Sequence, residues 1–275
     1  MYYYFQEYLL PIIVSVLFIL LNIFKNIKNL SRFGNELNEK LNEEDIFIIT
    51  NNCCKCYNLT FSNYKICRVK CDLCQIKRVI DFEKERDIYY LLENIGKKVK
   101  FLIHTEGGES DFPNFLTYIL KQNKIYVETF IPQYAISAGS FIALTSNIIR
   151  MNWYSSMGPV DTQVDYNLSN NDSDDECDES YPAKFIKEVK HKSNALTRLK
   201  AMESNSYHED DLFIIRSMFK KKQRQDLIIK HFLNTPLSHS IRYGPKDLSN
   251  YGLNIKIGIP NEITYIFKLF KKLNP

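Results

Sequence analysis

Short apolar runs alternate with amphipathic segments along most of this chain. Runs of about four to eight apolar or β-branched residues are typical of buried strands, whereas apolar residues at helical spacing are typical of helices. The strands predicted in this way are Asp45–Thr50, Arg78–Phe82, Val99–Ile103, Lys124–Ile131 and Ile148–Trp153. The predicted helices are Glu83–Ile95, Pro113–Gln122, Ser137–Ser146, most of Tyr181–Leu233, and Asn261–Lys272. This alternation predicts an α/β fold with a largely parallel sheet covered by helices.

The first segment has a different pattern, because Tyr8–Phe24 contains no charged residue and is rich in Leu, Ile, Val and Phe. A run of ~17 residues is about the shortest that spans a bilayer, so residues 1–28 are predicted to form an N-terminal transmembrane helix. The start lacks the basic residues of a cleaved signal peptide, which favours an uncleaved anchor. Lys25 and Lys28 follow the run whereas Glu7 precedes it, which places the bulk of this single-pass protein on the cytosolic side. A short buried or interfacial helix is the alternative.

Residues 29–75 combine a polar, helix-compatible stalk with a cysteine-rich insert that holds six of the seven cysteines. Two cysteine pairs have C-x-x-C spacing, and fourteen residues separate the pairs, which is close to the spacing of zinc ribbons. The predicted ligands of a structural zinc ion are Cys53, Cys56, Cys71 and Cys74, and either Cys54 or Cys67 could replace one of them. A reducing compartment favours zinc over disulfide bonds, which are the alternative.

Length, composition and charge narrow the class of protein. The 275 residues include 45% hydrophobic and 25% charged residues, values typical of a globular protein, and we place one large domain at residues 76–275. Residues 167–180 are rich in Asp, Glu, Asn and Ser and are predicted to form a disordered surface insertion in that domain. The net charge of +4 is small and no nucleic-acid-binding motif is present, so no nucleic-acid partner is expected.

Two junctions between a predicted strand and a predicted helix carry residues suited to catalysis. The first ends in the pair Gly107 and Gly108, and the second contains Ser137 directly before Ala138. A serine at the start of a helix lies beside backbone N–H groups that have no partner within the helix and can stabilise an oxyanion. The glycine pair lets backbone approach a substrate carbonyl from the other side. Together the junctions supply a nucleophile and two donors, as acyl transfer requires.

Other residues near these junctions offer alternative roles. Ser140 also lies near the start of the predicted helix and is an alternative nucleophile, whereas His104, at the end of a predicted strand, is an alternative base. The histidines further along lie in charged segments and are expected at the surface: His191, His208 and His231.

Three motifs follow one another in this part of the chain: Phe101–Gly108, Ile131–Gly139 and Met157–Gln163. In this order they resemble the serine dehydrogenase proteinase family, a membrane-anchored relative of the Clp proteases and the signal peptide peptidases. The resemblance covers roughly residues 78–259 and includes the pair Ser238-His239. It implies a Clp protease/crotonase-like ββα superhelix with a parallel sheet, no cofactor for catalysis, and a homo-oligomer.

Matching the family's motifs residue by residue implies a Ser-Asp-His triad. Ser137 would be the nucleophile, His239 the general base, and Asp161 the carboxylate that orients the imidazole. The backbone donors to the oxyanion would be the N–H groups of Gly107 or Gly108 and of Ala138.

The predicted function is therefore that of a membrane-anchored serine peptidase acting on a peptide or protein substrate. Glu106 departs from the family pattern, which usually has a proline there, and a carboxylate pointing into an oxyanion hole would oppose the reaction. A catalytically inactive membrane-bound scaffold of the same fold is one alternative, and a crotonase-type acyl-thioester enzyme is another. A Ser-Lys dyad of the signal-peptide-peptidase kind would instead draw its base from Lys184, Lys187 or Lys190.

Overall fold

The computed structural model describes residues 32–50, 60–61, 64–65, 79–81, 85–108, 111–166, 179–182, 195–235 and 238–273. Two predictions concern residues outside these ranges: the membrane anchor of residues 1–28, and the zinc site formed by Cys53, Cys56, Cys71 and Cys74. Both therefore stay predictions. Within the described ranges, no helix combines the length and the apolar character needed to cross a lipid bilayer.

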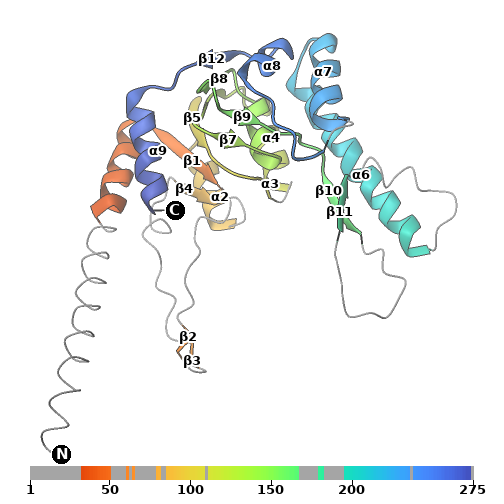
Figure 1. The fold of residues 1–275 in the computed structure, drawn as a ribbon, viewed down its shortest axis with the longest axis horizontal. Helices are drawn as coiled ribbons and strands as arrows, with labels where there is room; N and C mark the ends of the chain where they lie inside the picture. The colour runs from red at the N-terminus through yellow and green to blue at the C-terminus, as the bar shows by residue number, and fades with distance from the viewer. Residues whose placement is uncertain are drawn as a thin grey trace, which may run out of the picture.

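A six-stranded parallel sheet forms the centre of the fold (Figure 1). Its strands lie side by side in the order β12-β8-β6-β5-β1-β4. Their bounds are β1 (Ile46–Thr50), β4 (Val79–Asp81), β5 (Lys98–Ile103), β6 (Tyr126–Ile131), β8 (Ile148–Met151) and β12 (Ile255–Ile257). The α/β fold with a parallel sheet predicted from the alternating pattern is thus confirmed. Because the strands are parallel, the segments that follow β5 and β6 leave the sheet at the same edge.

Shorter strand pairs lie outside the main sheet. They are β2 (Thr60–Phe61) with β3 (Tyr64–Lys65), β7 (Tyr134–Ala135) with β9 (Ser156–Met157), and β10 (Gln163–Tyr166) with β11 (Glu179–Pro182). The last pair corrects two expectations, because β11 includes the end of the acidic tract and the start of the segment expected to be helical. Ser180 pairs with Asp165 and Tyr181 with Val164 in an antiparallel ladder. Residues 179–182 thus form a strand because their backbone pairs with β10, although the local composition predicted a disordered tract and a helix.

The helices alternate with the strands of the main sheet and then follow one another toward the C-terminus. They are residues 32–43, α2 (Glu85–Asn94), α3 (Asp111–Gln122), α4 (Ala138–Leu144), α6 (Ala195–Met218), α7 (Lys222–Ile228), the π-helix η3 (Ile229–Leu233), α8 (Pro245–Asn250) and α9 (Asn261–Leu273). The predicted helices of the central region and the final amphipathic helix are therefore present, with ends shifted by a few residues.

Helices cover both faces of the sheet. In β1, Phe47 and Ile49 belong to the larger hydrophobic cluster, whereas Ile46 and Ile48 belong to the smaller one. Successive side chains of a strand point to opposite faces, and a strand buried on both faces is apolar throughout. Helix α9 and the helix over residues 32–43 complete the smaller cluster, and Figure 1 shows these two helices together beside β1.

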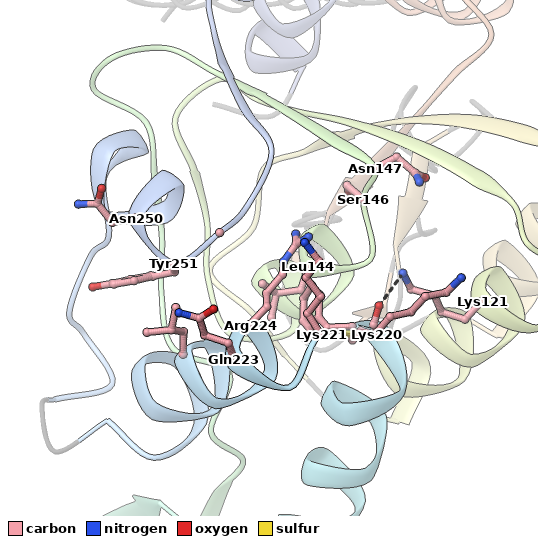
Figure 2. A pocket seen from close by; sticks show the side chains of 14 residues that line it. Lys121, Leu144, Ser146, Asn147, Lys220, Lys221, Gln223, Arg224, Asn250 and Tyr251 are labelled. Atoms are coloured by element: carbon pink, nitrogen blue, oxygen red, sulfur yellow. Dashed lines mark hydrogen bonds between the residues drawn. The ribbon is translucent and has the colours of Figure 1, made fainter.

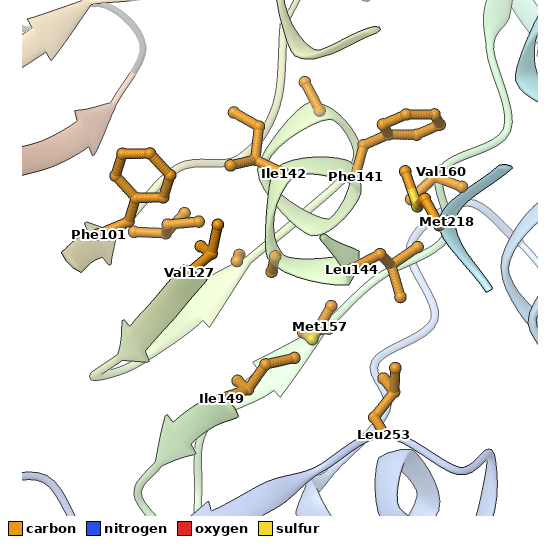
Figure 3. Packing of buried hydrophobic residues seen from close by; sticks show 14 of the residues in the cluster. Phe101, Val127, Phe141, Ile142, Leu144, Ile149, Met157, Val160, Met218 and Leu253 are labelled. Atoms are coloured by element: carbon orange, nitrogen blue, oxygen red, sulfur yellow. The ribbon is translucent and has the colours of Figure 1, made fainter. Parts of the chain in front are cut away.

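Helix α4 lies in the larger cluster on the other face of the sheet. All seven of its residues are buried. Figure 3 shows side chains of α4, Phe141, Ile142 and Leu144 among them, packed among residues of the sheet and Met218. A helix with no exposed face has little freedom to shift, because protein interiors are close-packed. This packing fixes the position of Ser137, the residue directly before the helix.

Candidate active site

Ser137 occupies a sharp turn between the short strand β7 and helix α4. Its backbone has φ 49° and ψ −118°, and its hydroxyl makes no capping hydrogen bond to the helix. A positive φ is uncommon for a residue other than glycine and persists where the surrounding structure holds it in place. Backbone hydrogen bonds flank the turn, since Ile136 N–H donates to Thr105 O (3.0 Å) and Gly139 N–H donates to Ile136 O (2.9 Å). The side chain of Ser137 is therefore presented, partly exposed, by a rigid junction.

Two glycines let this junction approach the end of β5. Gly107 has φ 118°, and a Cβ built on it would lie 2.7 Å from Ser137 Cβ and 3.2 Å from Ser137 Oγ. A Cβ on Gly139 would lie 2.3 Å from the Thr105 methyl group. Neither position has room for a side chain, so the two segments predicted to form the site lie in direct contact.

The backbone donors predicted for the oxyanion differ in their availability. Gly107 N–H donates to Thr105 Oγ1 (3.1 Å), so this amide is already engaged. Ala138 begins α4, and an N–H in the first turn has no partner inside the helix. Gly108 is exposed and has φ 152°. Of the two glycine amides predicted as alternatives, the structure therefore favours Gly108 over Gly107.

Asp161 and His239 form a hydrogen-bonded pair. The His239 Nδ1 atom lies 2.8 Å from Asp161 Oδ1, and Asp161 is almost completely buried while His239 is partly exposed. Gln163 Nε2 donates to Asp161 Oδ2 and to the Asp161 carbonyl, at 3.1 Å each, and lies 3.2 Å from His239 Nδ1. The carboxylate is thus fixed by Gln163, a residue to which the sequence analysis assigned no role.

Backbone pairing brings the segments that carry Asp161 and His239 beside the segment that carries Ser137. Ala135, two residues before Ser137, pairs with Met157, and Met157 pairs in turn with Tyr243. Asp161 follows Met157 by four residues, and His239 precedes Tyr243 by four residues. A further hydrogen bond, from Val160 N–H to Phe232 O (2.9 Å), anchors the segment just before Asp161.

Ser140, the alternative nucleophile, has a structural role. Its side chain is fully buried, and its hydroxyl donates to Ala135 O (2.6 Å) while accepting from Gly158 N–H (3.0 Å). These two bonds link the start of α4 to the strands on either side. A hydroxyl enclosed in this way has no access to a substrate, which leaves Ser137 as the exposed serine of the junction.

His104, the alternative base, lies on the opposite face of the sheet from α4. Its ring contacts Tyr134 and the α9 residues Phe267 and Phe270, with ring centroids 4.5, 5.1 and 6.4 Å apart. Burial lowers the pKa of His104 to about 4, with a further contribution from the charge of Lys271. The imidazole is therefore neutral at physiological pH, and its Nδ1 has no hydrogen-bond partner in the described part of the chain.

Glu106, the residue that departs from the family pattern, is not buried in the candidate site. Its side chain is exposed, whereas Gly107 next to it is buried. Burial raises the pKa of Tyr134, the charge of Glu106 raises it further, and the charge of Arg242 opposes this effect. The Glu106 carboxylate is therefore at the surface rather than buried in the candidate site.

The three alternative lysine bases and the three histidines expected at the surface are placed as follows. Lys184, Lys187 and Lys190 lie outside the described residues, as does His191. His231 is partly buried and stacks on Tyr251 with ring centroids 4.0 Å apart. His208 is buried, so the expectation that it lies at the surface was wrong.

A buried polar stripe on α6 explains that error and reveals an acid that sequence reasoning missed. Ser204, His208 and Asp211 are buried at helical spacing with Ile215. This spacing was the available signal, because residues three or four apart share one face of a helix. Asp211 accepts a hydrogen bond from Thr162 Oγ1 (2.7 Å), and burial raises its pKa to about 7. Asp211 thus supports, through Thr162, the segment that carries Asp161.

No group of three or more His, Cys, Asp or Glu side chains within the described ranges is arranged to bind a metal ion. The candidate site instead offers a partly exposed serine hydroxyl and an imidazole bonded to a carboxylate, which are groups suited to acyl transfer. Among the described residues, no hydrogen bond joins Ser137 to His239.

A model of a family described as ClpP-like SDH-type serine proteinases matches residues 75–273. The chain belongs to this family. The resemblance to the serine dehydrogenase proteinases inferred from the three motifs is therefore confirmed.

Two uncharacterized proteins of Methanocaldococcus jannaschii are similar to this chain. MJ1495 is 24% identical over 179 residues, which are 62% of this chain and 56% of that protein. MJ0137 is 22% identical over 184 residues, which are 64% of this chain and 59% of that protein. The chain thus spans between 56% and 59% of the length of these curated relatives.

Solved structures with a related arrangement include two variants of the 1510-N membrane-bound stomatin-specific protease. One covers 66% of this chain and 74% of its own, at 17% identity and a TM-score of 0.40. The other, in complex with a substrate peptide, covers 80% of this chain and 78% of its own, at 16% identity and a TM-score of 0.42. An enoyl-CoA hydratase from Polaromonas sp. JS666 covers 69% and 64%, at 8% identity and a TM-score of 0.33. These scores are low, so the family assignment rests on the family model.

The buried carboxyl of Asp211 predicts a pH-dependent stability. Because its pKa is raised to about 7 in the folded state, its contribution to stability is complete below its unfolded pKa of about 4 and is lost as the pH rises through about 7. Asp211→Asn removes the charge but keeps an oxygen that can accept the Thr162 hydroxyl. The stability of this variant relative to wild type should therefore rise between about pH 4 and 7 and then level off, by on the order of 2–4 kcal/mol.

Urea unfolding at several pH values measures this difference. Glu209→Gln is the matched control, because Glu209 is exposed on the same helix and its charge does not contribute to the raised pKa of Asp211. A loss of stability in Asp211→Asn that is the same at every pH would show that the carboxyl is ionised in the folded protein.

Proposed function

We propose that this member of the ClpP-like SDH-type family is an active serine endopeptidase that uses Ser137, His239 and Asp161. The observation that carries the proposal is the 2.8 Å contact between His239 Nδ1 and Asp161 Oδ1. An imidazole oriented by a buried carboxylate is the partner that a serine nucleophile needs. The partly exposed Ser137, held in a strained turn before α4, supports the same role.

In this mechanism the carboxylate of Asp161 accepts a hydrogen bond from the Nδ1–H group of His239, which leaves Nε2 as the basic nitrogen. Nε2 takes the proton of the Ser137 hydroxyl as Oγ attacks the peptide carbonyl. The imidazolium then protonates the leaving amine, and water hydrolyses the acyl-enzyme by the same route in reverse. Gln163 holds the carboxylate in place by donating to its other oxygen.

The tetrahedral intermediate needs hydrogen-bond donors for its oxyanion. Ala138 N–H and Gly108 N–H are the available amides, because Gly107 N–H donates to Thr105 Oγ1. Gly107 still has a role, since its missing side chain leaves room for Ser137 Oγ and for the substrate carbonyl beside it. Donors fixed before the reaction stabilise the developing charge without reorganisation.

Replacing the three side chains tests the triad. Ser137→Ala should abolish both labelling by a fluorophosphonate probe and hydrolysis of a peptide substrate. His239→Ala should lower the rate by on the order of 10⁴–10⁶-fold, because a serine hydroxyl without a base is a poor nucleophile. Asp161→Asn should cost as much or less, since it misorients the imidazole without removing it. Probe labelling and single-turnover hydrolysis measure these effects.

Ser240→Ala is the control, because Ser240 is an exposed serine next to His239. An active His239→Ala variant together with inactive Lys184→Ala or Lys187→Ala would replace the triad by a Ser-Lys dyad. A wild-type protein that never labels, with labelling restored by Glu106→Pro, would show that Glu106 disables the site and that the protein is a scaffold.

Membrane attachment is a second part of the proposal, supported by the uncharged run Tyr8–Phe24 and the basic residues after it. The full chain should remain in the membrane fraction after carbonate extraction, with the protease domain on the cytosolic side. Deletion of residues 1–28 should release a soluble domain. Recovery of the full-length chain in the soluble fraction would contradict an integral anchor and favour the buried or interfacial helix.

We also propose a homo-oligomer, which analytical ultracentrifugation of the released domain tests.

A structural zinc ion in the insert is the third part, supported by the paired C-x-x-C spacing of Cys53, Cys56, Cys71 and Cys74. Protein purified under reducing conditions should contain about one zinc per chain by elemental analysis. Cys71→Ser should lower this content, whereas Cys177→Ser should not, because Cys177 lies outside the insert. Metal-free protein with a Cys53–Cys74 disulfide by mass spectrometry would contradict the zinc site.

A further inference from the structure

A cavity of about 660 Å³ lies among the ends of several helices, and none of the three residues proposed for the triad lines it. Figure 2 shows Lys121 of α3, Leu144 at the end of α4, and Arg224 of α7 around it. The turn between α6 and α7 and residues 250–252 complete the wall. The volume lies within the range of small-molecule sites, about 300–1000 Å³.

The cavity is strongly basic. Its lining includes four cationic side chains and no carboxylate, the cations being Lys121, Lys220, Lys221 and Arg224. None of the four forms a salt bridge with another residue in the described part of the chain. Burial lowers the pKa of Lys121 and of Arg224, and the charge of Arg224 lowers that of Lys121 further. Like charges thus converge on a partly desolvated space, an arrangement that a bound anion would stabilise.

Arg224 is held in place before any ligand binds. Its guanidinium lies over the Phe219 ring, 4.6 Å from the centroid, and its stem packs against Gly252. A Cβ on Gly252, which has φ 85°, would lie 3.5 Å from Arg224 Cγ. The Nε atom is buried and has no hydrogen-bond partner among the described residues. The fixed Arg224 side chain lines the cavity, and the planar fork of a guanidinium is suited to bidentate recognition of an oxyanion.

The turn that carries Lys220 and Lys221 is also ordered by hydrogen bonds. Gln225 Nε2 donates to the carbonyl oxygens of Arg216 and Phe219, which tie α7 to the end of α6. Lys121 Nζ donates to Met218 O (3.3 Å), the dashed contact in Figure 2. The cations are therefore presented by a braced turn rather than by a free loop.

Three helices, α3, α4 and α6, end at this cavity, and their carbonyl ends attract cations. A helix end carries about half a negative charge, so three ends balance roughly 1.5 of the four positive charges. Lys121 already uses one of these carbonyls. The helix ends thus account for part of the positive charge, and the rest has no counterpart in the lining.

We propose that this cavity binds the phosphate group of a small molecule, with the phosphate between Arg224, Lys221 and Lys220 and the remainder of the ligand against Leu144 and Leu227. Phosphate suits the site because its oxygens match both a planar guanidinium and the ammonium groups. The apolar residues of the lining suit a ligand that is larger than the ion itself. The phosphate can come from a soluble phosphate ester or from a lipid headgroup, and binding does not depend on an active Ser137.

Calorimetric titration of the full-length protein tests this site with three probes: pyrophosphate, AMP and dihexanoyl phosphatidylglycerol, a lipid short enough to dissolve as a monomer. At least one probe should bind, and higher salt should weaken the binding because the attraction is electrostatic. Binding of pyrophosphate or AMP identifies a soluble ligand, and binding of the short lipid alone identifies a headgroup. Arg224→Gln and Lys221→Gln should each weaken binding about tenfold or more.

Lys256→Gln is the control, because Lys256 is exposed on β12 and does not line the cavity. This variant should bind like wild type. Thermal unfolding without ligand checks each variant's fold, and Lys221→Gln carries the test if Arg224→Gln is unstable, since Lys221 is exposed. The proposal is overturned if no probe binds at about millimolar concentration, or if Lys256→Gln weakens binding as much as Lys221→Gln. In either case the cations serve the helix ends alone.

Discussion

The contact between Gly107 and Ser137 is the constraint on which the arrangement of the site depends. The backbone after β5 lies so close to the turn before α4 that a Cβ on Gly107 would fall 2.7 Å from Ser137 Cβ. The positive φ of Ser137 costs on the order of 1–3 kcal/mol. Burial of the whole of α4 offsets this cost, because apolar area removed from water contributes about 25 cal/mol per Å². The packing that buries α4 therefore also holds Ser137 in the position that the proposed mechanism requires.

The acid-base pair depends on a second set of contacts. Asp161 and His239 are 78 positions apart, and pairing of Met157 with both Ala135 and Tyr243 brings their segments together. Gln163 and Asp211 then restrict the segment around Asp161, one by bonding its carboxylate and the other by bonding Thr162. A site built this way tolerates little movement of α6, even though that helix supplies none of the proposed catalytic residues.

Charge is distributed unevenly between the interior and the helix ends. Burial favours the neutral form of His104, with a pKa of about 4, and of Asp211, with a pKa of about 7. The cations Lys121 and Arg224, in contrast, lie at a cavity where their charge can meet solvent or a ligand. Neutral titratable groups inside the core avoid the desolvation cost that ionised groups would incur.

The alternation of apolar runs determined the strands and helices, and the composition of the junction before α4 singled out Ser137, because periodicity and turn composition are local properties of a chain. The ordered motifs determined the family. Tertiary structure decided which of the neighbouring groups are free. It buried Ser140, turned His104 to the face of α9, engaged the Gly107 amide with Thr105, and placed Asp211 behind Asp161 through Thr162. These outcomes depend on which distant segments pack against each residue, and residue spacing along the chain carries no information about that packing.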